Sequence, residues 1–236
     1  MKKRDWIGLL FPRRCPVCHE AVEERGQLCC QVCRLKLPYV RGVFCQKCGK
    51  PLLSGAEEYC RDCAKKPHRY RRGRAPFLYD PVMRSSIARF KYGGRREYAA
   101  FYAEEILRSC GREIRLWNAQ ALVPIPLHPS RRRKRGYNQA ELLARELSRR
   151  TGIPVDERLL LRTKKTKAQK ELNDQERLEN LKHAFSVRKG RTSPERIIIV
   201  DDIYTTGSTI DEAAGTLAAN GARSVYFLCI CVGRDQ

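Results

Sequence analysis

Two adjacent acids and a loop of small hydroxylated residues follow a short apolar run near the end of the chain. The run, residues 197–200, has four β-branched side chains and predicts a strand that is buried on both faces. Asp201 and Asp202 would stand at the carboxyl end of this strand, where their carboxylates could accept hydrogen bonds from two vicinal sugar hydroxyls. The loop after them could surround a phosphate with amides and hydroxyls, from Thr205, Thr206, Gly207, Ser208 and Thr209.

A helix is predicted directly behind this loop, over residues 210–219, with Gly221 placed to end it. Its N-terminus would turn the positive end of the helix dipole toward the same phosphate. Gly207 would let the backbone approach the phosphate closely, because it carries no side chain. The segment therefore predicts a ribose 5-phosphate site, and the alternative is a buried strand followed by an ordinary hydroxyl-rich turn.

Residues 196–209 resemble the phosphoribosyl-diphosphate (PRPP) motif of the type I phosphoribosyltransferases, with Tyr204 in place of the usual second aliphatic residue. The resemblance implies an α/β fold with a mostly parallel sheet, and Mg²⁺ as the ion that accompanies PRPP. Alternating strands and helices indicate the same fold class. Strands are predicted at 75–79, 121–127 and 225–232, and helices at 82–90, 97–109 and 136–150.

Eight of the twelve cysteines form four CxxC pairs, with eleven residues between each pair and the next. In a reducing compartment such pairs are typical of metal sites, and two pairs supply the closed four-thiolate shell of structural zinc. The sequence therefore predicts two structural Zn²⁺ ions, held by Cys15, Cys18, Cys30, Cys33, Cys45, Cys48, Cys60 and Cys63.

An internal repeat indicates how the four pairs combine. The segment that starts at Cys15 resembles the one that starts at Cys45, with an offset of 30 residues, so each unit could hold one ion by itself. An interleaved pairing uses the same ligands, and the sequence leaves it open. Cys29 breaks the spacing, and we expect it to be a spectator.

The charge of the chain is a third signal. The formal net charge is +22, from 48 basic and 26 acidic residues, and it concerns partners rather than fold. A phosphate-rich polymer is the first candidate partner, an anionic lipid surface is the second, and a merely basic soluble protein is the alternative. No apolar run approaches the roughly 20 residues that span a membrane, and the basic N-terminal segment shows no small-residue cleavage site. We therefore expect a cytoplasmic protein.

The chain divides at a basic stretch marked by proline and glycine, residues 65–74. Residues 1–66 form the predicted double zinc ribbon, which holds too few aliphatic side chains to fold without metal. Residues 67–236 form the predicted phosphoribosyltransferase-like domain.

A second loop follows the predicted strand 121–127. In the type I phosphoribosyltransferases, which the acid segment resembles, a loop after an earlier strand grips the pyrophosphate of PRPP. Ile125, Pro126 and Leu127 occupy the corresponding place. Five consecutive cations follow at 131–135, and they either bind a polyanion or form a solvated basic loop.

Taken with the CxxC units in front of them, these two segments make the whole chain resemble the ComF family. The stretch HPSRRRKRGYNQ at 128–139 is the most particular part of the resemblance, and RFKYGG at 89–94 also matches. Residues 162–185 match as well, and they take the place of the hood that closes over PRPP in type I enzymes. The resemblance implies further pyrophosphate contacts from Lys164, Lys165, Gln169, Arg177 and Asn180.

The ComF resemblance implies a role in competence, the uptake of DNA by naturally transformable bacteria. ComF proteins are thought to work on the cytosolic side of the membrane with a helicase-like ATPase, beside the DNA-uptake machinery, as single-stranded DNA enters. Two hypotheses follow. One is a single-stranded DNA-binding protein whose PRPP loop holds a ligand, and the other is an active phosphoribosyltransferase that transfers ribose 5-phosphate from Mg–PRPP to a nitrogenous acceptor.

The DNA hypothesis names two kinds of contact. Tyr39, Phe44, Tyr59 or Tyr70 could stack bases. The backbone could be followed by Arg69, Arg71, Arg72, Arg74, Arg131, Arg132, Arg133, Lys134 and Arg135. For the enzyme hypothesis, the sequence shows no acceptor pocket.

Overall fold

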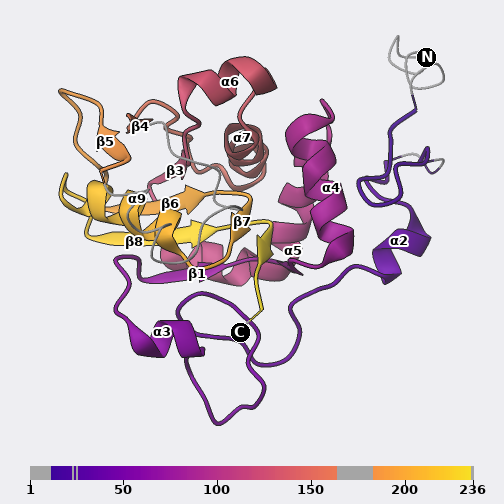
Figure 1. The fold of residues 1–236 in the computed structure, drawn as a ribbon, viewed down its shortest axis with the longest axis horizontal. Coiled ribbons are helices and arrows are strands. Elements are labelled where there is room, and N and C mark those ends of the chain that lie inside the picture. The colour runs from indigo at the N-terminus through magenta and orange to yellow at the C-terminus, as the bar shows by residue number, and fades with distance from the viewer. Residues whose placement is uncertain (1–11, 23, 25, 164–182, 235–236) are drawn as a thin grey trace.

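The computed structural model describes residues 12–22, 24, 26–163 and 183–234. Its centre is a four-stranded parallel sheet in the order β1-β8-β6-β3 (Figure 1). The four strands are β1 (Arg72–Arg74), β3 (Ala121–Pro124), β6 (Arg196–Val200) and β8 (Ser224–Leu228). The predicted mostly parallel α/β fold is therefore confirmed.

A smaller parallel sheet, in the order β2-β9-β7, continues the chain beyond three of these strands. Its strands are β2 (Phe77–Leu78), β7 (Ile203–Tyr204) and β9 (Cys231–Val232). The prediction of one strand over 225–232 is wrong, because β8 ends at Leu228 and the chain then crosses to this second sheet. The carbonyl of Asp202 holds the crossing, since it accepts hydrogen bonds from the amides of Ile230 and Cys231 at 3.0 and 3.1 Å.

Helices α4 (Pro81–Tyr92), α5 (Tyr98–Trp117) and α7 (Gln139–Thr151) cover one face of the central sheet, and α9 (Ser208–Ala218) covers the other. The alternation of side chains along β6 shows this. Ile198 packs into the core with the first three helices, whereas Ile197 and Ile199 pack into the core with α9. All four helices were predicted, but α5 is longer than expected, so Cys110 lies buried inside it.

The run of cations at 131–135 forms a helix, α6 (Pro129–Arg135), and not an irregular loop. The local sequence explains it. His128 caps the N-terminus by accepting from the amide of Ser130 at 3.3 Å, and Pro129 suits the first helical position. Gly136 ends the helix with a left-handed φ of 78°. His128 thus has a structural role.

An antiparallel hairpin of β4 (Leu160–Arg162) and β5 (Phe185–Val187) frames the segment predicted to be the hood. Residues 164–182 lie outside the described residues. The five hood candidates Lys164, Lys165, Gln169, Arg177 and Asn180 are among them, so their placement stays a prediction. None of the helices within the described ranges is both long and apolar enough to cross a membrane.

The two cysteine units share one local structure at the predicted offset. Arg14 bridges Ala21 in the first unit, and Phe44 bridges Pro51 in the second. Each unit ends in a short helix that starts directly after a cysteine, α2 (Gln31–Leu35) or α3 (Arg61–Lys65). The internal repeat seen in the sequence is therefore a structural repeat.

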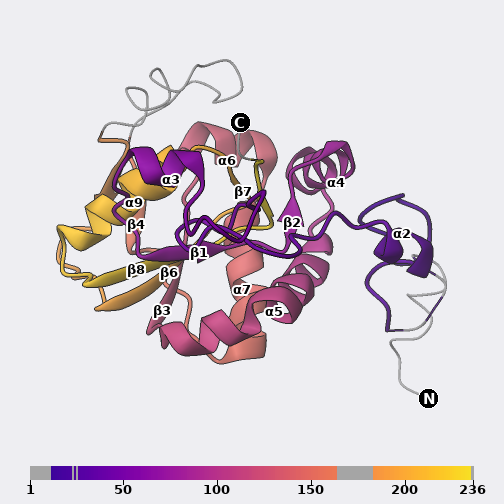
Figure 2. The same cartoon turned by 90° about the horizontal axis from the view of Figure 1, so that it is seen from below.

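The two units dock on opposite faces of the central sheet. Leu28, Cys33 and Leu37 of the first belong to the core with α4 and α5, whereas Cys45 and Cys48 of the second belong to the core with α9. Figures 1 and 2 show α2 beyond α4 and α3 on the side of α9 and β1. Both units are packed against the larger domain.

The basic stretch between the two parts is not a simple linker, because it contributes β1 at the edge of the central sheet. Gly73 explains how it fits. A Cβ at this position would lie 1.9 Å from the ring of Phe227 on the neighbouring strand, so β1 can approach β8 only without a side chain here.

Candidate functional site

The two loops predicted to bind PRPP lie side by side at the carboxyl edge of the central sheet. They follow β3 and β6, which are parallel neighbours with Pro124 opposite Val200. The amide of Ile125 donates to the carbonyl of Val200 at 2.9 Å, and Asn138 donates to the carbonyl of Ile125 at 2.9 Å. Residues 125–127 are thereby held against the strand that ends in the acid pair.

A lysine that the sequence analysis did not place in the site binds the acid pair. Nζ of Lys91 lies 2.7 Å from Oδ1 of Asp202, and these side chains are 19% and 16% exposed. Burial opposes the ammonium charge, but the Asp202 carboxylate outweighs it and raises the pKa of Lys91. Burial, and then the Asp202 charge, raise the pKa of Asp201 to about 7. Lys91 therefore stays charged, while Asp201 titrates near neutral pH.

Lys91 belongs to the segment RFKYGG, residues 89–94, which matched the family without an assigned role. Two hydrogen bonds join this segment to the HPSRRRKRGYNQ segment. The hydroxyl of Tyr137 donates to the carbonyl of Phe90, and Nε2 of Gln139 donates to the carbonyl of Lys91 at 3.2 Å. The two most family-like segments therefore fit together beside the acid pair, an arrangement for which the sequence offers no spacing signal.

Gly207 shapes the predicted phosphate loop. It has a left-handed φ of 80° and precedes the first residue of α9. It offers no side-chain cap, so the first-turn amides of α9 can bind an anion. A Cβ at Gly207 would lie 2.6 Å from the hydroxyl oxygen of Tyr204. Glycine is thus required by a protein neighbour, in addition to the close phosphate approach that we expected.

Tyr204, the departure from the usual motif, connects the phosphate loop to the second cysteine unit. Its ring is 2% exposed and stacks on Phe227, with centroids 4.7 Å apart and an interplanar angle of 5°. Its hydroxyl lies 2.6 Å from that of Tyr70, which packs in the same core as Cys45 and Cys48. The Tyr204 ring therefore supports the phosphate loop, which explains why an aromatic residue stands where the motif usually has an aliphatic one.

An acid in the first turn of α9 would repel a phosphate if it were unpaired. This acid, Asp211, is held by the region before β1: its carboxylate lies 2.6 Å from Nδ1 of His68 and accepts from the amide of Arg69 at 3.0 Å. The Arg69 side chain itself lies against α9, because a Cβ at Gly215 would be 2.3 Å from its Nη1. The Asp211 carboxylate is thus bound by His68 and by the amide of Arg69, which follow the second cysteine unit in the sequence.

Two arginines bring further positive charge to the acid pair. Burial, and then the neighbouring Arg131, lower the pKa of Arg162 to about 10, while Asp201 acts in the opposite direction. Arg162 is therefore charged at neutral pH and lies within the field of both Arg131 and Asp201. Together with Lys91, these cations make the carboxyl edge suitable for a polyphosphate.

The predicted DNA contacts fall into two separate groups. The first group lies before and in β1, and its members have different partners. Arg71 lies 3.3 Å from the Ser224 hydroxyl. Arg74 pairs with Glu113 at 2.9 Å, and its guanidinium carbon lies 3.4 Å from the centroid of the Phe44 ring. Those of α6 stand together on one short helix that precedes α7 (Figure 1). The helix carries Arg131, Arg132, Arg133, Lys134 and Arg135.

The eight predicted zinc ligands gather in two groups of four. The sulfurs lie within 4.8 Å of one another in the group Cys15, Cys18, Cys30, Cys33 and in the group Cys45, Cys48, Cys60, Cys63. The pairing is therefore sequential. The sulfurs of Cys18 and Cys30 are 3.8 Å apart, and those of Cys48 and Cys60 are 3.6 Å apart. A tetrahedral zinc site with Zn–S bonds of about 2.3 Å places two sulfurs roughly 3.8 Å apart, so both distances suit zinc. The donor sets thus fit two structural zinc ions.

Cys29 lies beside the first group without belonging to it. Its side chain is fully buried, and its sulfur lies 3.6 Å from that of Cys15. The expectation of a spectator agrees with this position, because the four ligands are already supplied by the CxxC pairs.

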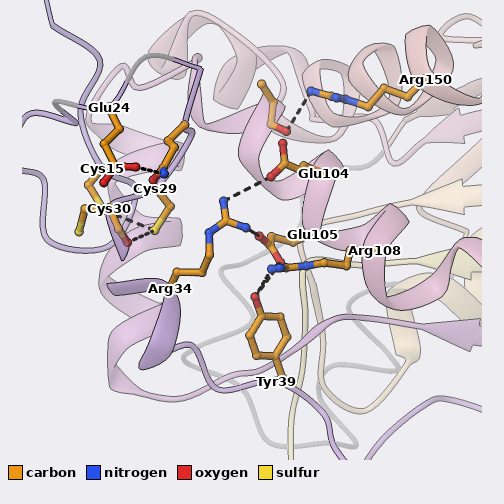
Figure 3. A network of polar contacts seen from close by, with 12 residues as sticks. Cys15, Glu24, Cys29, Cys30, Arg34, Tyr39, Glu104, Glu105, Arg108 and Arg150 are labelled. Carbon is orange, nitrogen blue, oxygen red and sulfur yellow. Dashed lines mark hydrogen bonds and ion pairs between the residues drawn. The ribbon is translucent and has the colours of Figure 1, made fainter. Parts of the chain in front are cut away.

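A buried glutamate docks the first cysteine unit on α5 (Figure 3). Glu105 is completely buried, and its carboxylate accepts from Arg34 at 3.1 Å and from the hydroxyl of Tyr39 at 2.8 Å. Arg108 forms a further ion pair with it. Because breaking a buried ion pair is costly, this network fixes the unit in place. Tyr39, a predicted base-stacking residue, is thus used inside the protein.

Comparisons with known proteins agree with both parts of the chain. The double zinc ribbon domain matches residues 6–64. DNA utilization protein YhgH of Salmonella typhimurium is 31% identical over 220 residues, covering 92% of this chain and 89% of that protein. Competence protein F of Haemophilus influenzae is 32% identical over 192 residues, covering 77% of this chain and 81% of that protein.

Among solved structures, the chain is similar to purine phosphoribosyltransferase from Pyrococcus horikoshii. The match covers 56% of this chain and 74% of that chain, at 14% identity and a TM-score of 0.36. A likeness of this size carries no argument about function.

Proposed function

The chain belongs to the ComF family, and we propose that it handles single-stranded DNA during DNA uptake and carries a PRPP-binding site. Its relatives are named for competence and for DNA utilization, which supports the DNA role. In this proposal the protein works in the cytoplasm with a helicase-like ATPase, near the membrane DNA-uptake machinery. The net charge of +22 suits a polyanionic partner.

One observation carries the PRPP proposal. The acid pair at the end of β6 is separated from the uncapped N-terminus of α9 only by β7 and residues 205–207, so that acceptors for sugar hydroxyls and donors for a phosphate lie close together in the chain. Asp201 and Asp202 then accept from the ribose hydroxyls, and the amides of residues 205–209 bind the 5-phosphate. Residues 125–127 and Mg²⁺ hold the pyrophosphate. Lys91 holds the Asp202 carboxylate in place, since its Nζ lies 2.7 Å from Oδ1.

Calorimetry with PRPP in magnesium buffer tests this site. We expect saturable binding to the wild-type protein. Asp202→Asn should weaken it by about 10- to 100-fold, because a hydrogen bond to a charged group contributes about 1.5–3 kcal/mol. A matched control is Asp156→Asn, which removes a carboxylate paired with Arg191 at 2.6 Å elsewhere on the surface. Equal affinities of Asp202→Asn and the wild type would refute the assignment of the acid pair.

A separate assay distinguishes binding from transfer. In the region where type I enzymes read a base, the side chains of residues 229–232 are fully buried. We therefore expect intact PRPP to bind without pyrophosphate release across a panel of bases and amines. Release that depends on one of these acceptors would instead assign a phosphoribosyltransferase activity.

A further inference from the structure

An exposed aromatic ring stands directly beside the acid site. Tyr92, the last residue of α4, is 71% exposed, whereas Phe90 two positions earlier is fully buried. The residue between them, Lys91, binds Asp202. Most of the Tyr92 side chain is therefore in contact with solvent, although it directly follows the lysine that binds the acid pair.

The ring of Tyr92 has one face covered and one face open. The guanidinium carbon of Arg135 lies 4.7 Å from the ring centroid, and Nη2 of Arg135 donates to the Tyr92 hydroxyl at 3.2 Å. Gln139 accepts from Arg135 at 2.6 Å and so holds the guanidinium in position. Because the residue is 71% exposed in spite of this cover, the opposite ring face points into solvent.

The backbone under the ring is fixed. The carbonyl of Phe90 accepts a hydrogen bond from Tyr137, just before α7, and that of Lys91 accepts one from Gln139, the first residue of α7. A ring on a fixed backbone, held by its own hydroxyl, loses little conformational entropy when it binds a flat partner. The structure thus offers a preorganised stacking surface.

Exposed cations lie on the same short helix as Arg135 and next to its end. Arg133 and Lys134 are exposed on α6, and Arg96 is exposed next to the end of that helix, with its guanidinium 4.9 Å from the ring of Tyr137. Arg132 differs, because it pairs with Glu141 at 2.6 Å. An open aromatic face flanked by cations matches the two groups that a nucleic acid strand presents, bases and phosphates.

We propose that Tyr92, supported by Arg135, is the platform on which a base of single-stranded nucleic acid stacks, while Arg96, Arg133 and Lys134 bind the flanking phosphates. This inference rests on the proposed DNA role and assigns it a surface. A single strand fits better than a duplex, since its bases have free faces. It fits better than a lipid surface, because the residues next to Tyr92 in the sequence, Lys91, Gly93 and Gly94, offer no further apolar side chain to bury in a bilayer.

The base-stacking residues predicted from sequence do not offer such a surface, although one of them is exposed. Tyr39 binds Glu105, Phe44 lies under Arg74, and Tyr70 is 1% exposed. Tyr59 is 47% exposed and lies in the second cysteine unit, and no cation–π contact is recorded for it among the described residues. It therefore serves as the matched control.

Fluorescence anisotropy with two labelled strands of about 20 nucleotides, oligo-dT and an abasic strand of the same length, tests the platform. The zinc-loaded full chain should bind oligo-dT about tenfold more tightly than the abasic strand, as stacking of one base predicts. Tyr92→Ala should lose this preference, and Tyr92→Phe and Tyr59→Ala should keep it. Arg133→Ala should weaken both strands equally and reduce the slope of log affinity against log salt by about one.

The outcomes separate a failure of the proposed DNA role from a failure of the Tyr92 platform. If the wild type binds neither strand in a salt-dependent way, the DNA role and the platform both fail. If the wild type binds both strands but Tyr92→Ala keeps the preference for bases, the DNA role stands and the platform is refuted. If Tyr92→Ala weakens binding to phosphatidylserine vesicles and leaves oligo-dT binding unchanged, the surface belongs to lipid and the proposal is overturned. Unchanged zinc content and thermal unfolding serve as the test of folding for every variant.

Discussion

The ion pair between Lys91 and Asp202 should make the acid site depend on a lysine that lies outside the sugar-phosphate motif at 196–209. The substitution Lys91→Met keeps the length of the side chain and removes its charge. It leaves the Asp202 carboxylate, 16% exposed, without the ammonium that lies 2.7 Å away. We expect the variant to fold, to be less stable than the wild type, and to bind PRPP more weakly.

The structure sets the size of the effect. At 2.7 Å, and with an effective dielectric constant of about 20, the gross attraction is about 6 kcal/mol. Desolvation of both groups offsets most of it, and because both side chains keep some exposure the net loss should fall below the 3–5 kcal/mol of a fully buried pair. We expect a loss of about 2 kcal/mol, or about 4–8 °C in Tm for a chain of this length.

A double-mutant cycle measured by urea unfolding at pH 6 and pH 8 tests this reasoning. Lys91→Met and Asp202→Asn should couple by about 2 kcal/mol at pH 8, because each alone strands one partner. Lowering the pH protonates Asp201, whose pKa is raised to about 7, and a pair with one negative charge fewer needs its counter-cation less, so the loss in Lys91→Met should be smaller at pH 6. Lys134→Met, on the exposed face of α6, is the control. A cost in Lys91→Met below about 0.5 kcal/mol at pH 8, with no coupling, would refute the role of the lysine.

Three further predictions concern the same site and the zinc units. Because the pKa of Asp201 is about 7, calorimetry should show PRPP binding about tenfold more weakly at pH 6 than at pH 8. Asp201→Asn should flatten this pH profile, and a profile that the substitution leaves unchanged contradicts the assignment of Asp201 to the site. Gly207→Ala should lower the free energy of unfolding more than Gly94→Ala does. Both glycines have a positive φ, but only at Gly207 would the added Cβ lie 2.6 Å from a tyrosine hydroxyl. Equal losses of stability in thermal melts would exclude the clash. Replacing Cys15 and Cys18 together by Ser should lower the zinc content measured by plasma emission from two ions to one per chain, and a content that stays at two would rule out these two cysteines as zinc ligands.

Sequence patterns were sufficient for the features that rest on local chemistry. The β-branched run at 197–200 could only be a buried strand, and the acids and glycine after it placed a loop and a helix correctly. The four CxxC pairs with their 30-residue offset indicated two metal sites, and the structure groups the thiols accordingly. Helix α4 was predicted over 82–90, and its observed start at Asp80 and Pro81 follows ordinary capping rules.

The features that sequence reasoning missed depend on tertiary contacts. Lys91 reaches Asp202 across 111 positions of the chain, and Tyr204 meets Tyr70 across 134, separations that no periodicity reveals. The strand predicted at 225–232 is broken because a carbonyl from Asp202, far away in sequence, captures two of its amides. The cation run was predicted as a loop because charge dominated its appearance, although His128 and Gly136 carried the signals of a helix.

The most direct test of the central claim is a crystal structure of the zinc-loaded protein with PRPP and Mg²⁺. We predict ribose hydroxyls within hydrogen-bond distance of Asp201 and Asp202, and the 5-phosphate on the amides of residues 205–209. A ligand bound elsewhere, or an empty loop at PRPP concentrations that saturate calorimetric binding, would contradict the account.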